Sequence, residues 1–417
     1  MQPLNLHSHR GTGASAIYPL LGCALEPTWA FIATELDERS YNFASTNVCI
    51  NNLSDRICVV KISGNTSGDS EVHSQDGKLQ FGFEHLFSEF GGKNDSAYDD
   101  GMEIQFTMCN PPFYRSLEDV TESEAVKEFA AFGVCTGAPV EMITPGGEVH
   151  FVGAMVRESV HSKAAAEEGV TRLGEDHKLK EKRRRAADGS VLPRAAETEA
   201  NSTHPSRSER QVVRWYTSML GKMSSVEEIV KVFKELTITN YAITEFVQGQ
   251  TRRWAVGWSH SSYRLSDDIA RIAHPNPTLQ RLLPLRNTLR FPLGDGAGEL
   301  LQRVLDDMEG INVSLRRAND RADNGEKCEV CMVLAMQDSW SRGARRKRKR
   351  DAALGSEGAA ATLDPALACL VAVVPGEVPD LEVRWVYGRD RALFESFASH
   401  VAAKVNRGCT VGATALF

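Results

Sequence analysis

The stretch Gly11-Thr-Gly-Ala-Ser15, followed by the apolar segment Ala16–Gly22, decides the fold. Glycines this close together are typical of a turn between a strand and a helix, where the backbone can approach a ligand and helix N–H groups favour anions. The apolar run Trp29–Thr34 predicts the next strand, which closes on Glu35. The glycine turn alone, or the acid alone, would be weak evidence for a binding site. An acid roughly 20 residues after such a turn, however, commonly accepts hydrogen bonds from ribose hydroxyls. Together they predict a site for a cofactor that contains a nucleoside.

Strand and helix patterns alternate along the next part of the chain, which predicts an α/β fold with a parallel sheet. The predicted elements are a helix over Arg39–Asn51, strands over Ile57–Ile62, Met102–Cys109 and Val212–Leu220, and a helix over Val226–Leu236. Two further strands, Asn240–Gln248 and Arg252–Ser259, flank Gly249 and predict an antiparallel hairpin at the end of the sheet. The predicted domain comprises residues 1–161 and 211–262.

The segment Asn110-Pro-Pro-Phe113 comes directly after the predicted strand Met102–Cys109, at the edge where open α/β sheets bind ligands. The Asn110 side-chain oxygen and the Pro111 carbonyl can each accept a hydrogen bond from one amino group. Pro111 and Pro112 fix the backbone, and Phe113 can stack on a planar ring. The segment therefore predicts group transfer to a planar amine, with catalysis by positioning. A plain Pro-Pro turn would not explain the flanking Asn and Phe.

The composition narrows the class of protein. The chain has 417 residues, 42% of them hydrophobic, which is enough for two domains with sizeable cores. It lacks both an apolar run of about 18 residues and a secretory signal pattern, so neither a membrane span nor secretion is predicted. Nine cysteines, an odd number spread along the chain, favour a reducing compartment. The net charge is −7, so any contact with nucleic acid requires local basic patches. The histidines show no metal-ligand spacing, and no metal site is predicted.

Two charged segments interrupt the folded pattern. Residues 162–210 contain no aromatic residue and include the basic run Lys178–Arg185, which predicts a disordered charged insertion. Residues 338–364 contain Arg345-Arg-Lys-Arg-Lys-Arg350 and predict a long basic loop. Each basic run is compatible with a nuclear address, a contact with a polyanion or a solvated charged loop. We expect a nuclear protein, with the cytoplasm as the alternative.

Residues 285–407 predict a small α+β accessory domain that contains this basic loop. Its expected strands are Asn287–Leu293, Ile311–Leu315, Glu329–Met336, Ala368–Val374 and Leu381–Tyr387, and its expected helices are Ala297–Met308 and Asp390–Val405. Cys328 and Cys331 form a single CxxC pair in an apolar strand, which favours core cysteines over zinc ligands.

This set of motifs resembles the methyltransferase-like 16 / ribosomal-RNA large-subunit methyltransferase F family of adenine-N6 RNA methyltransferases. The resemblance covers roughly Gly11–Ser259, interrupted by the insertion. It rests on the order and spacing of Gly11–Gly22, Ala33–Asp37, Asn51–Asp55, Met108–Phe113, Gly146-Gly-Glu148, Arg214–Lys222, Thr244–Gly249, Arg253-Trp254 and Gly257–Ser259.

The resemblance implies a Rossmann-like class I methyltransferase fold with S-adenosyl-L-methionine as cofactor. Carried over by position, the implied cofactor contacts are Gly11, Gly13, Ser15, Glu35, Thr66 and Asn110. Asn110, Pro111, Pro112 and Phe113 are implied to form the catalytic pocket for the target adenine. The implied product is N6-methyladenosine, formed on U6 small nuclear RNA or structured RNA hairpins, whereas bacterial relatives act on ribosomal RNA. Eukaryotic relatives also carry a C-terminal RNA-binding region, to which residues 285–407 are a candidate counterpart.

The chain departs from the family pattern just before the glycine turn. His9 and Arg10 stand where the family has an acid and an apolar residue, and Pro3–Ser8 predicts a poor central strand. The family also has an upstream segment that supplies a basic cofactor contact, so the chain is expected to be N-terminally truncated. We therefore expect S-adenosylmethionine to bind weakly or not at all.

Two alternative functions stay open at this point. Asn-Pro-Pro-Tyr occurs in protein-glutamine methyltransferases, which also present an amide nitrogen to the cofactor. A chain with this fold could also be a non-catalytic RNA-binding protein. Phe113 in place of Tyr and the basic runs favour a nucleic acid substrate.

Overall fold

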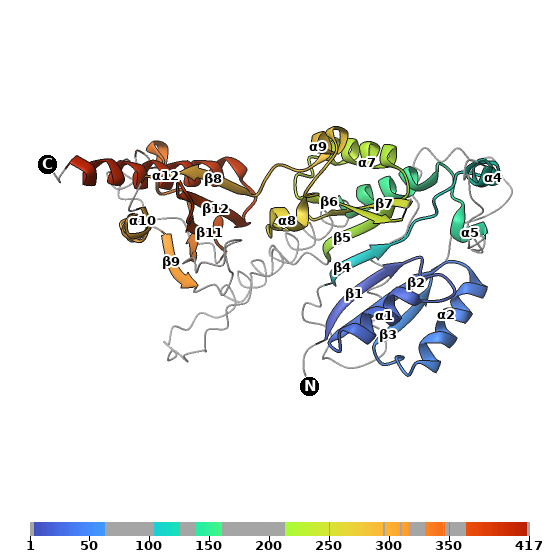
Figure 1. Cartoon of the computed structure of the whole chain (residues 1–417). Helices are drawn as coiled ribbons and strands as arrows, with labels where there is room; N and C mark the ends of the chain where they lie inside the picture. The colour runs from blue at the N-terminus through green and yellow to red at the C-terminus, as the bar shows by residue number, and fades with distance from the viewer. Residues whose placement is uncertain are drawn as a thin grey trace, which may run out of the picture. The chain divides into compact units, whose positions relative to one another are not determined.

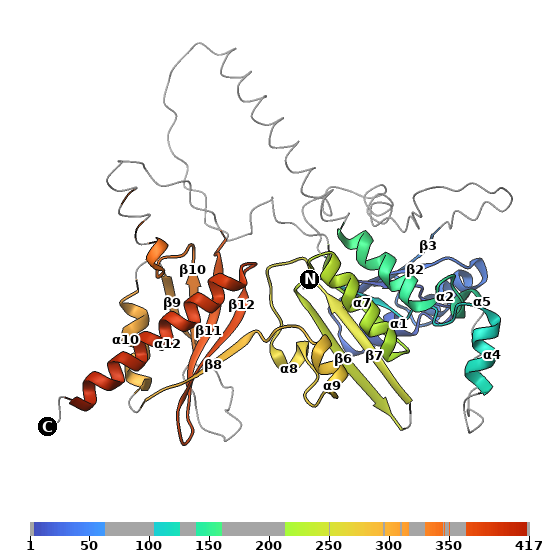
Figure 2. The same ribbon diagram turned by 90° about the horizontal axis from the view of Figure 1, so that it is seen from above.

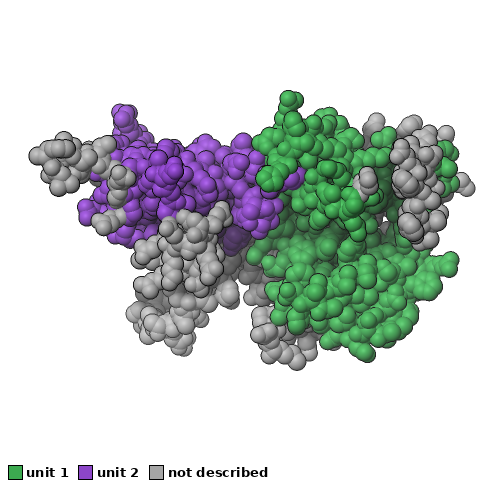
Figure 3. Space-filling model, in the orientation of Figure 1, with its two compact units in different colours: residues 1–261, 274–283 green, residues 262–273, 284–417 purple. Residues whose placement is uncertain are grey.

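The computed structural model describes residues 4–62, 104–125, 139–160, 213–249, 251–294, 297–308, 311–316, 330–344, 346, 350 and 364–414. The predicted insertion 162–210 and Thr66 lie outside these residues. The chain divides into two compact units, coloured separately in Figure 3. Unit 1 comprises Met1–Ser261 and His274–Leu283, and unit 2 comprises Ser262–Ala273 and Pro284–Phe417.

Unit 1 is built on a seven-stranded sheet with the order β3-β2-β1-β4-β5-β7-β6 (Figure 1). The strands are β1 (Asn5–Arg10), β2 (Trp29–Glu35), β3 (Ile57–Lys61), β4 (Ile104–Cys109), β5 (Val213–Leu220), β6 (Tyr241–Gln248) and β7 (Thr251–Trp258). Strands β1 to β5 pair in parallel. Strand β7 is antiparallel to both of its neighbours. This is the Rossmann-like fold of class I methyltransferases, and the predicted parallel sheet with a terminal hairpin is confirmed.

The helices of unit 1 cover the sheet with apolar faces. Helix α2 (Glu38–Ile50) starts at Asp37, whose side chain caps the Ser40 N–H at 2.8 Å. Its buried residues Ser40, Ala44 and Val48 recur every fourth position, as expected for one helix face. Helix α1 (Ile17–Leu25) shares a core with α2, β2 and β3, and α7 (Met223–Glu235) packs on β5 and β7. The remaining helices are α4 (Leu117–Ala125), α5 (Pro139–Met142), α9 (Pro277–Leu282) and a helix over 147–160.

The prediction that the stretch before Gly11 is a poor central strand is wrong. It forms β1, which pairs with β2 and β4 in the middle of the sheet. His7 packs as a flat ring, with its centroid 4.4 Å from that of Trp29 and 4.1 Å from that of Phe106. The His7 ring is thus packed among aromatic rings, and Arg10 pairs with Glu158, which lowers the cost of burying these two side chains.

Unit 2 is a five-stranded antiparallel sheet with two helices that contact each other and the same sheet (Figure 2). The strand order is β8 (Thr288–Pro292), β12 (Asp380–Tyr387), β11 (Leu367–Val374), β10 (Val330–Ala335) and β9 (Ile311–Arg316). The helices that pack on it are α10 (Ala297–Asp306) and α12 (Arg391–Thr414), and a short helix α8 (Asp267–Ala270) precedes them. The predicted α+β fold of this part is confirmed.

Four further observations bear on the sequence predictions. Cys331 is buried in the core of unit 2, while Cys328 lies outside the described residues. Nowhere in the described part of the chain do His, Cys, Asp and Glu side chains gather as a metal would require. The predicted basic loop 338–364 lies between β10 and β11, and residues 342–344, 346 and 350 within it are helical. No helix within the described ranges has the length and apolar character to span a bilayer.

Candidate cofactor and substrate site

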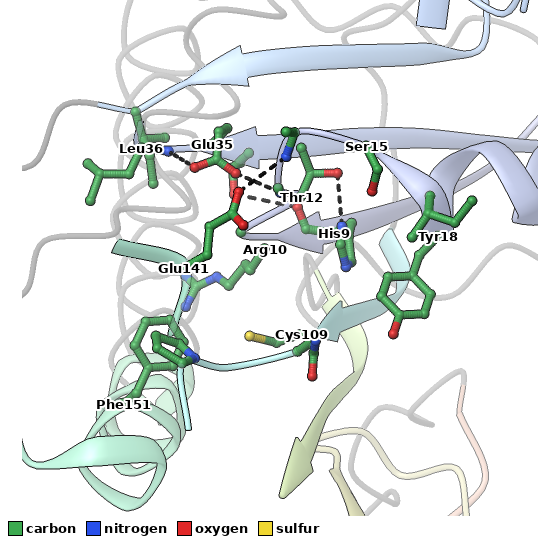
Figure 4. A pocket seen from close by; sticks show the side chains of 18 residues that line it. His9, Arg10, Thr12, Ser15, Tyr18, Glu35, Leu36, Cys109, Glu141 and Phe151 are labelled. Carbon is green, nitrogen blue, oxygen red and sulfur yellow. Dashed lines mark hydrogen bonds between the residues drawn. The ribbon is translucent and has the colours of Figure 1, made fainter. Parts of the chain in front are cut away.

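A cavity of about 450 Å³ opens at the carboxyl edge of the unit 1 sheet, where β1, β2 and β4 end (Figure 4). This is a common size for a small-molecule site. Six residues predicted for the site contribute to its lining: Gly11, Gly13, Ser15, Glu35, Asn110 and Pro112. The structure therefore brings the glycine turn, the acid at the end of β2 and the segment after β4 around one space.

The glycine turn requires glycine on conformational grounds. Gly11 and Gly13 both have φ of 63°, in the left-handed region, where a side chain would be strained. A Cβ added at Gly11 would meet no atom within 4 Å, so the backbone here borders open space. The Thr12 N–H donates to the Thr34 carbonyl at 2.9 Å, which ties the turn to the end of β2. The turn is thus held in place with its backbone facing the cavity.

Glu35 is a buried carboxylate that the backbone holds rigidly. Its side chain is 5% exposed. Its Oε2 atom accepts from the Gly13 N–H at 2.7 Å, and its Oε1 atom accepts from the Leu36 and Asp37 N–H groups at 2.9 and 3.1 Å. Each carboxylate oxygen has two lone pairs, so acceptor capacity remains for a hydroxyl donor from a ligand.

The segment Asn110–Phe113 divides between two surroundings. Asn110 is exposed and, with Pro112, lines the cavity. Pro111 is buried, and neither Pro111 nor Phe113 is among the lining residues. The Phe113 ring instead lies near Gly221, where an added Cβ would be 3.0 Å from Phe113 Cδ1. The Arg253 guanidinium lies 5.8 Å from the ring centroid.

Glu148 holds the backbone beside this ring. It is 3% exposed, and its carboxylate accepts from the Gly221 N–H at 2.6 Å and the Lys222 N–H at 3.1 Å. These groups precede helix α7, whose first-turn N–H donors favour a carboxylate. The Gly146-Gly-Glu148 motif thus joins the start of the helix over 147–160 to the turn that packs against Phe113.

Two residues that sequence reasoning missed also line the cavity. Glu141, in the four-residue helix α5, accepts from the Ala14 N–H at 3.3 Å and from the Ser40 hydroxyl at 2.9 Å. His9 places Nδ1 3.0 Å from Thr12 Oγ1. Both lie a few residues from motifs that the sequence analysis identified. Neither belongs to a sequence pattern from which a contact with the glycine turn could be predicted.

Burial sets the protonation of two side chains at the floor of the cavity. It lowers the pKa of His9 to about 4, so the ring is neutral at pH 7. It also raises the pKa of the Cys109 thiol to about 12, against the opposing effect of Arg10 and a hydrogen bond with Ser218. At neutral pH Cys109 is thus an uncharged thiol and His9 an uncharged ring.

Residues 7–82, 84–185 and 197–262 match the model of a protein family described as RNA methyltransferase. The chain belongs to this family, the methyltransferase-like 16 family of RNA methyltransferases. The match spans both halves of the unit 1 sheet and includes the glycine turn, Glu35 and the Asn110–Phe113 segment.

Several relatives are similar over most of the chain. The U6 small nuclear RNA (adenine-(43)-N(6))-methyltransferase of Schizosaccharomyces pombe is 29% identical over 400 residues, which is 94% of this chain and 77% of that protein. The human RNA N(6)-adenosine-methyltransferase METTL16 is 27% identical over 357 residues, 82% of this chain and 50% of that protein. The chain therefore spans about half the length of the human relative.

Solved structures of human METTL16 are also similar to this chain. The catalytic domain in complex with MAT2A 3′UTR hairpin 1 is 26% identical, with a TM-score of 0.39 over 65% of this chain and 68% of that chain. The N-terminal domain in complex with SAH is 27% identical, with a TM-score of 0.33 over 61% of each chain.

Proposed function

We propose that this protein transfers a methyl group from S-adenosyl-L-methionine to the N6 atom of an adenine in RNA. The observation that carries the proposal is the meeting of the Gly11–Ser15 turn, Glu35 and Asn110 around one cavity of a class I methyltransferase sheet. Family membership supports the reaction class. Asn110, Pro111, Pro112 and Phe113 are the residues we assign to the adenine, and Gly11, Gly13, Ser15, Glu35 and Asn110 those we assign to the cofactor.

The residues of the cavity fit S-adenosylmethionine. The backbone at Gly11 borders open space and so permits close approach. Glu35 is a rigid acceptor at the end of β2, suited to a ribose hydroxyl. The exposed Asn110 and Ser15 add polar groups to the lining of the cavity. When bound, the cofactor supplies an electrophilic methyl group.

The work of the chain in this reaction is positioning. The Asn110 side-chain oxygen and the Pro111 carbonyl accept hydrogen bonds from the adenine amino group and orient its lone pair. The amine can lose its proton after the methyl group arrives, so the attacking step needs no general base. This agrees with the buried state of His9, whose ring is 1% exposed and neutral. Phe113, held beside Gly221 by the Glu148 contact, supplies a flat surface for the base.

We assign an RNA substrate of the U6 small nuclear RNA type or a structured hairpin. The Schizosaccharomyces pombe relative is named for U6 small nuclear RNA and matches 94% of this chain. We also assign RNA contact to unit 2. Burial lowers the pKa of Arg264 to about 10, and the nearby positive charges of Arg391 and Arg389 add to this effect. Neighbouring arginines of this kind suit phosphate groups.

We propose that the protein is located in the nucleus. The distribution in cells of the tagged chain, with and without the run 345–350, would test this location.

Labelled methyl transfer tests the proposal directly. The chain is incubated with methyl-labelled S-adenosylmethionine and either U6-type RNA or a protein extract, and label is expected in N6-methyladenosine of the RNA. Asn110→Ala should lower transfer about 100-fold or more, as loss of a preorganised group does in other enzymes, while RNA affinity changes little. Asn42→Ala, an exposed residue of α2 outside the cavity, is the matched control. Label in protein glutamine instead would favour the glutamine methyltransferase alternative, and RNA binding without transfer the non-catalytic one.

A further inference from the structure

Two carboxylates of the protein, rather than one, accept hydrogen bonds from the N–H groups of the glycine turn. Glu35 accepts from the Gly13 N–H, and Glu141 accepts from the next one, at Ala14 (Figure 4). A glycine turn that opens a helix favours anions at these N–H groups. In this structure the chain itself supplies the anions.

The two carboxylates are held very differently. Glu35 is the last residue of β2, is 5% exposed and accepts three backbone N–H bonds of 2.7 to 3.1 Å. Glu141 is partly exposed, comes from the four-residue helix α5, and meets the Ala14 N–H at 3.3 Å. That distance is longer than the usual 2.9–3.0 Å and indicates a weaker bond. Glu141 also accepts from the Ser40 hydroxyl at 2.9 Å, so its departure would break that bond besides the weak backbone one. It is still the more easily displaced of the two carboxylates, because Glu35 would lose three backbone bonds.

The backbone around Glu141 stays anchored if its side chain moves. The Tyr114 N–H donates to the Met142 carbonyl at 3.0 Å, and the Thr144 N–H donates to the Tyr114 carbonyl at 2.9 Å. These bonds fix the segment after Glu141 to the residue that follows Phe113. A change of side-chain rotamer can thus free the Ala14 N–H without unfolding α5.

We infer that Glu141 is a specificity-determining residue of the cofactor site, because its carboxylate competes with the carboxylate of the cofactor's amino-acid end for the Ala14 N–H. One N–H group cannot donate a full hydrogen bond to two anions, and two carboxylates at the turn repel each other. Ligands that bear a carboxylate must displace Glu141, whereas nucleosides without one need not. The inference rests on the proposed function, since it takes this cavity as the cofactor site.

A matched pair of ligands isolates the effect. S-adenosylhomocysteine and 5′-methylthioadenosine are both thioethers of the same nucleoside, but only the first carries the amino and carboxylate groups. Calorimetric titration of the full chain with Glu141→Ala should show S-adenosylhomocysteine bound about fivefold more tightly than by the unmodified chain, because removal of the competitor returns part of one charge-assisted hydrogen bond. The affinity for 5′-methylthioadenosine should stay the same.

Three further measurements make the outcome decisive. Glu141→Gln keeps an acceptor but loses the charge, and should shift S-adenosylhomocysteine binding in the same direction by a smaller factor. Glu228→Gln, an exposed acid of α7 outside the cavity, removes the same charge and should change nothing. An analogue with the amino group but without the carboxylate should gain no affinity. Thermal melting of each variant confirms that it is folded.

The failures are distinguishable. If the unmodified chain and the Glu141 variants bind S-adenosylhomocysteine equally, or the variants bind it more weakly, Glu141 does not compete and the inference is wrong while the proposed function stands. Equal tightening of all three ligands would point to a loosened cavity and would also overturn it. Absence of S-adenosylhomocysteine binding by every form would overturn the proposed function and the inference together.

Discussion

Arg10 at the end of β1 and Glu158 in the helix over 147–160 form an ion pair, with Arg10 Nη2 3.0 Å from Oε2 and 3.1 Å from Oε1 of Glu158. Their side chains are 8% and 20% exposed. Burial raises the pKa of Glu158, and the Arg10 charge opposes that rise. Because Arg10 directly precedes the glycine turn, the pair fixes the strand that positions the candidate cofactor site.

Removing Glu158 should destabilise the protein more than removing a surface acid. Glu158→Ala deprives a buried guanidinium of this carboxylate, and breaking such a pair costs roughly 3 kcal/mol. Glu228→Ala, which breaks the exposed pair with Lys231, should cost less than about 1 kcal/mol. Urea unfolding followed by circular dichroism measures both. Equal midpoints for the two variants would show that the Arg10–Glu158 pair does not secure β1.

Replacing both members of the pair should restore stability. The double variant Arg10→Met/Glu158→Leu exchanges two buried charges for apolar groups of similar size, which is often neutral or stabilising. Its urea midpoint should therefore lie closer to that of the unmodified chain than that of Glu158→Ala does. A double variant less stable than the single one would mean that Arg10 and Glu158 are held by other contacts.

His7 should make the folded state sensitive to mild acid. Burial among aromatic rings lowers the pKa of His7 from 6.5 to about 4. Below pH 6.5 the unfolded chain binds a proton on this residue that the folded chain does not, so stability should fall as the pH drops from about 6.5 to about 4. Below pH 4 this contribution should be constant.

Thermal melting across that pH range tests the assignment. His7→Leu removes the titrating group, and its melting temperature should depend less on pH between 6.5 and 4 than that of the unmodified chain. His274→Leu changes an exposed histidine and should leave the pH dependence as it was. Identical pH profiles for His7→Leu and the unmodified chain would contradict the role of His7.

The strands and helices with a regular hydrophobic pattern could be predicted from the sequence, whereas β1 could not. The pattern of β2 is evident because its first five residues, Trp29 to Ala33, are all apolar. Strand β1 carries His, Ser and Arg instead, and is stabilised by residues far along the chain. The aromatic surroundings of His7 and the carboxylate of Glu158, 148 residues from Arg10, are visible only in the folded chain.

In the candidate site, too, some residues could be predicted from the sequence and others could not. Gly11 and Gly13 could be predicted from the glycine-rich turn itself. Glu35 could be predicted because it closes a recognisable strand, and Asn110 because it follows one; the ends of parallel strands meet at one edge. Glu141 could not, because a four-residue helix has too few positions for a periodic pattern. Its contact with Ala14 joins residues 127 positions apart.

Phe113 should act as a stacking surface for a base. An aromatic ring at this position should therefore be required for activity, whether it belongs to Phe or to Tyr. Phe113→Ala should weaken binding and methylation of RNA by roughly 1–3 kcal/mol, while Phe113→Tyr should keep most of both. Phe43→Ala is a matched control, because Arg39 lies 5.8 Å from the Phe43 ring, as Arg253 does from Phe113. Fluorescence titration with RNA and methyl-transfer assays give the comparison. Equal losses for Ala and Tyr would exclude stacking by Phe113.

The basic run 345–350 should contribute to RNA affinity through counterion release. Arg346 and Arg350 are both exposed in the described part of the run, so their charges are free to approach phosphates. Replacing all six residues with Ser should weaken RNA binding and flatten the slope of log affinity against log salt, by about 0.7 for each phosphate of single-stranded RNA that is no longer neutralised. Replacing Lys231, which is paired with Glu228, should leave the slope unchanged. RNA titrations at several salt concentrations measure both slopes. Replacement of Lys178–Arg185 with Ser tests the basic run of the insertion in the same way. A slope that stays constant after the change at 345–350 would assign that run to a nuclear address or a solvated surface instead.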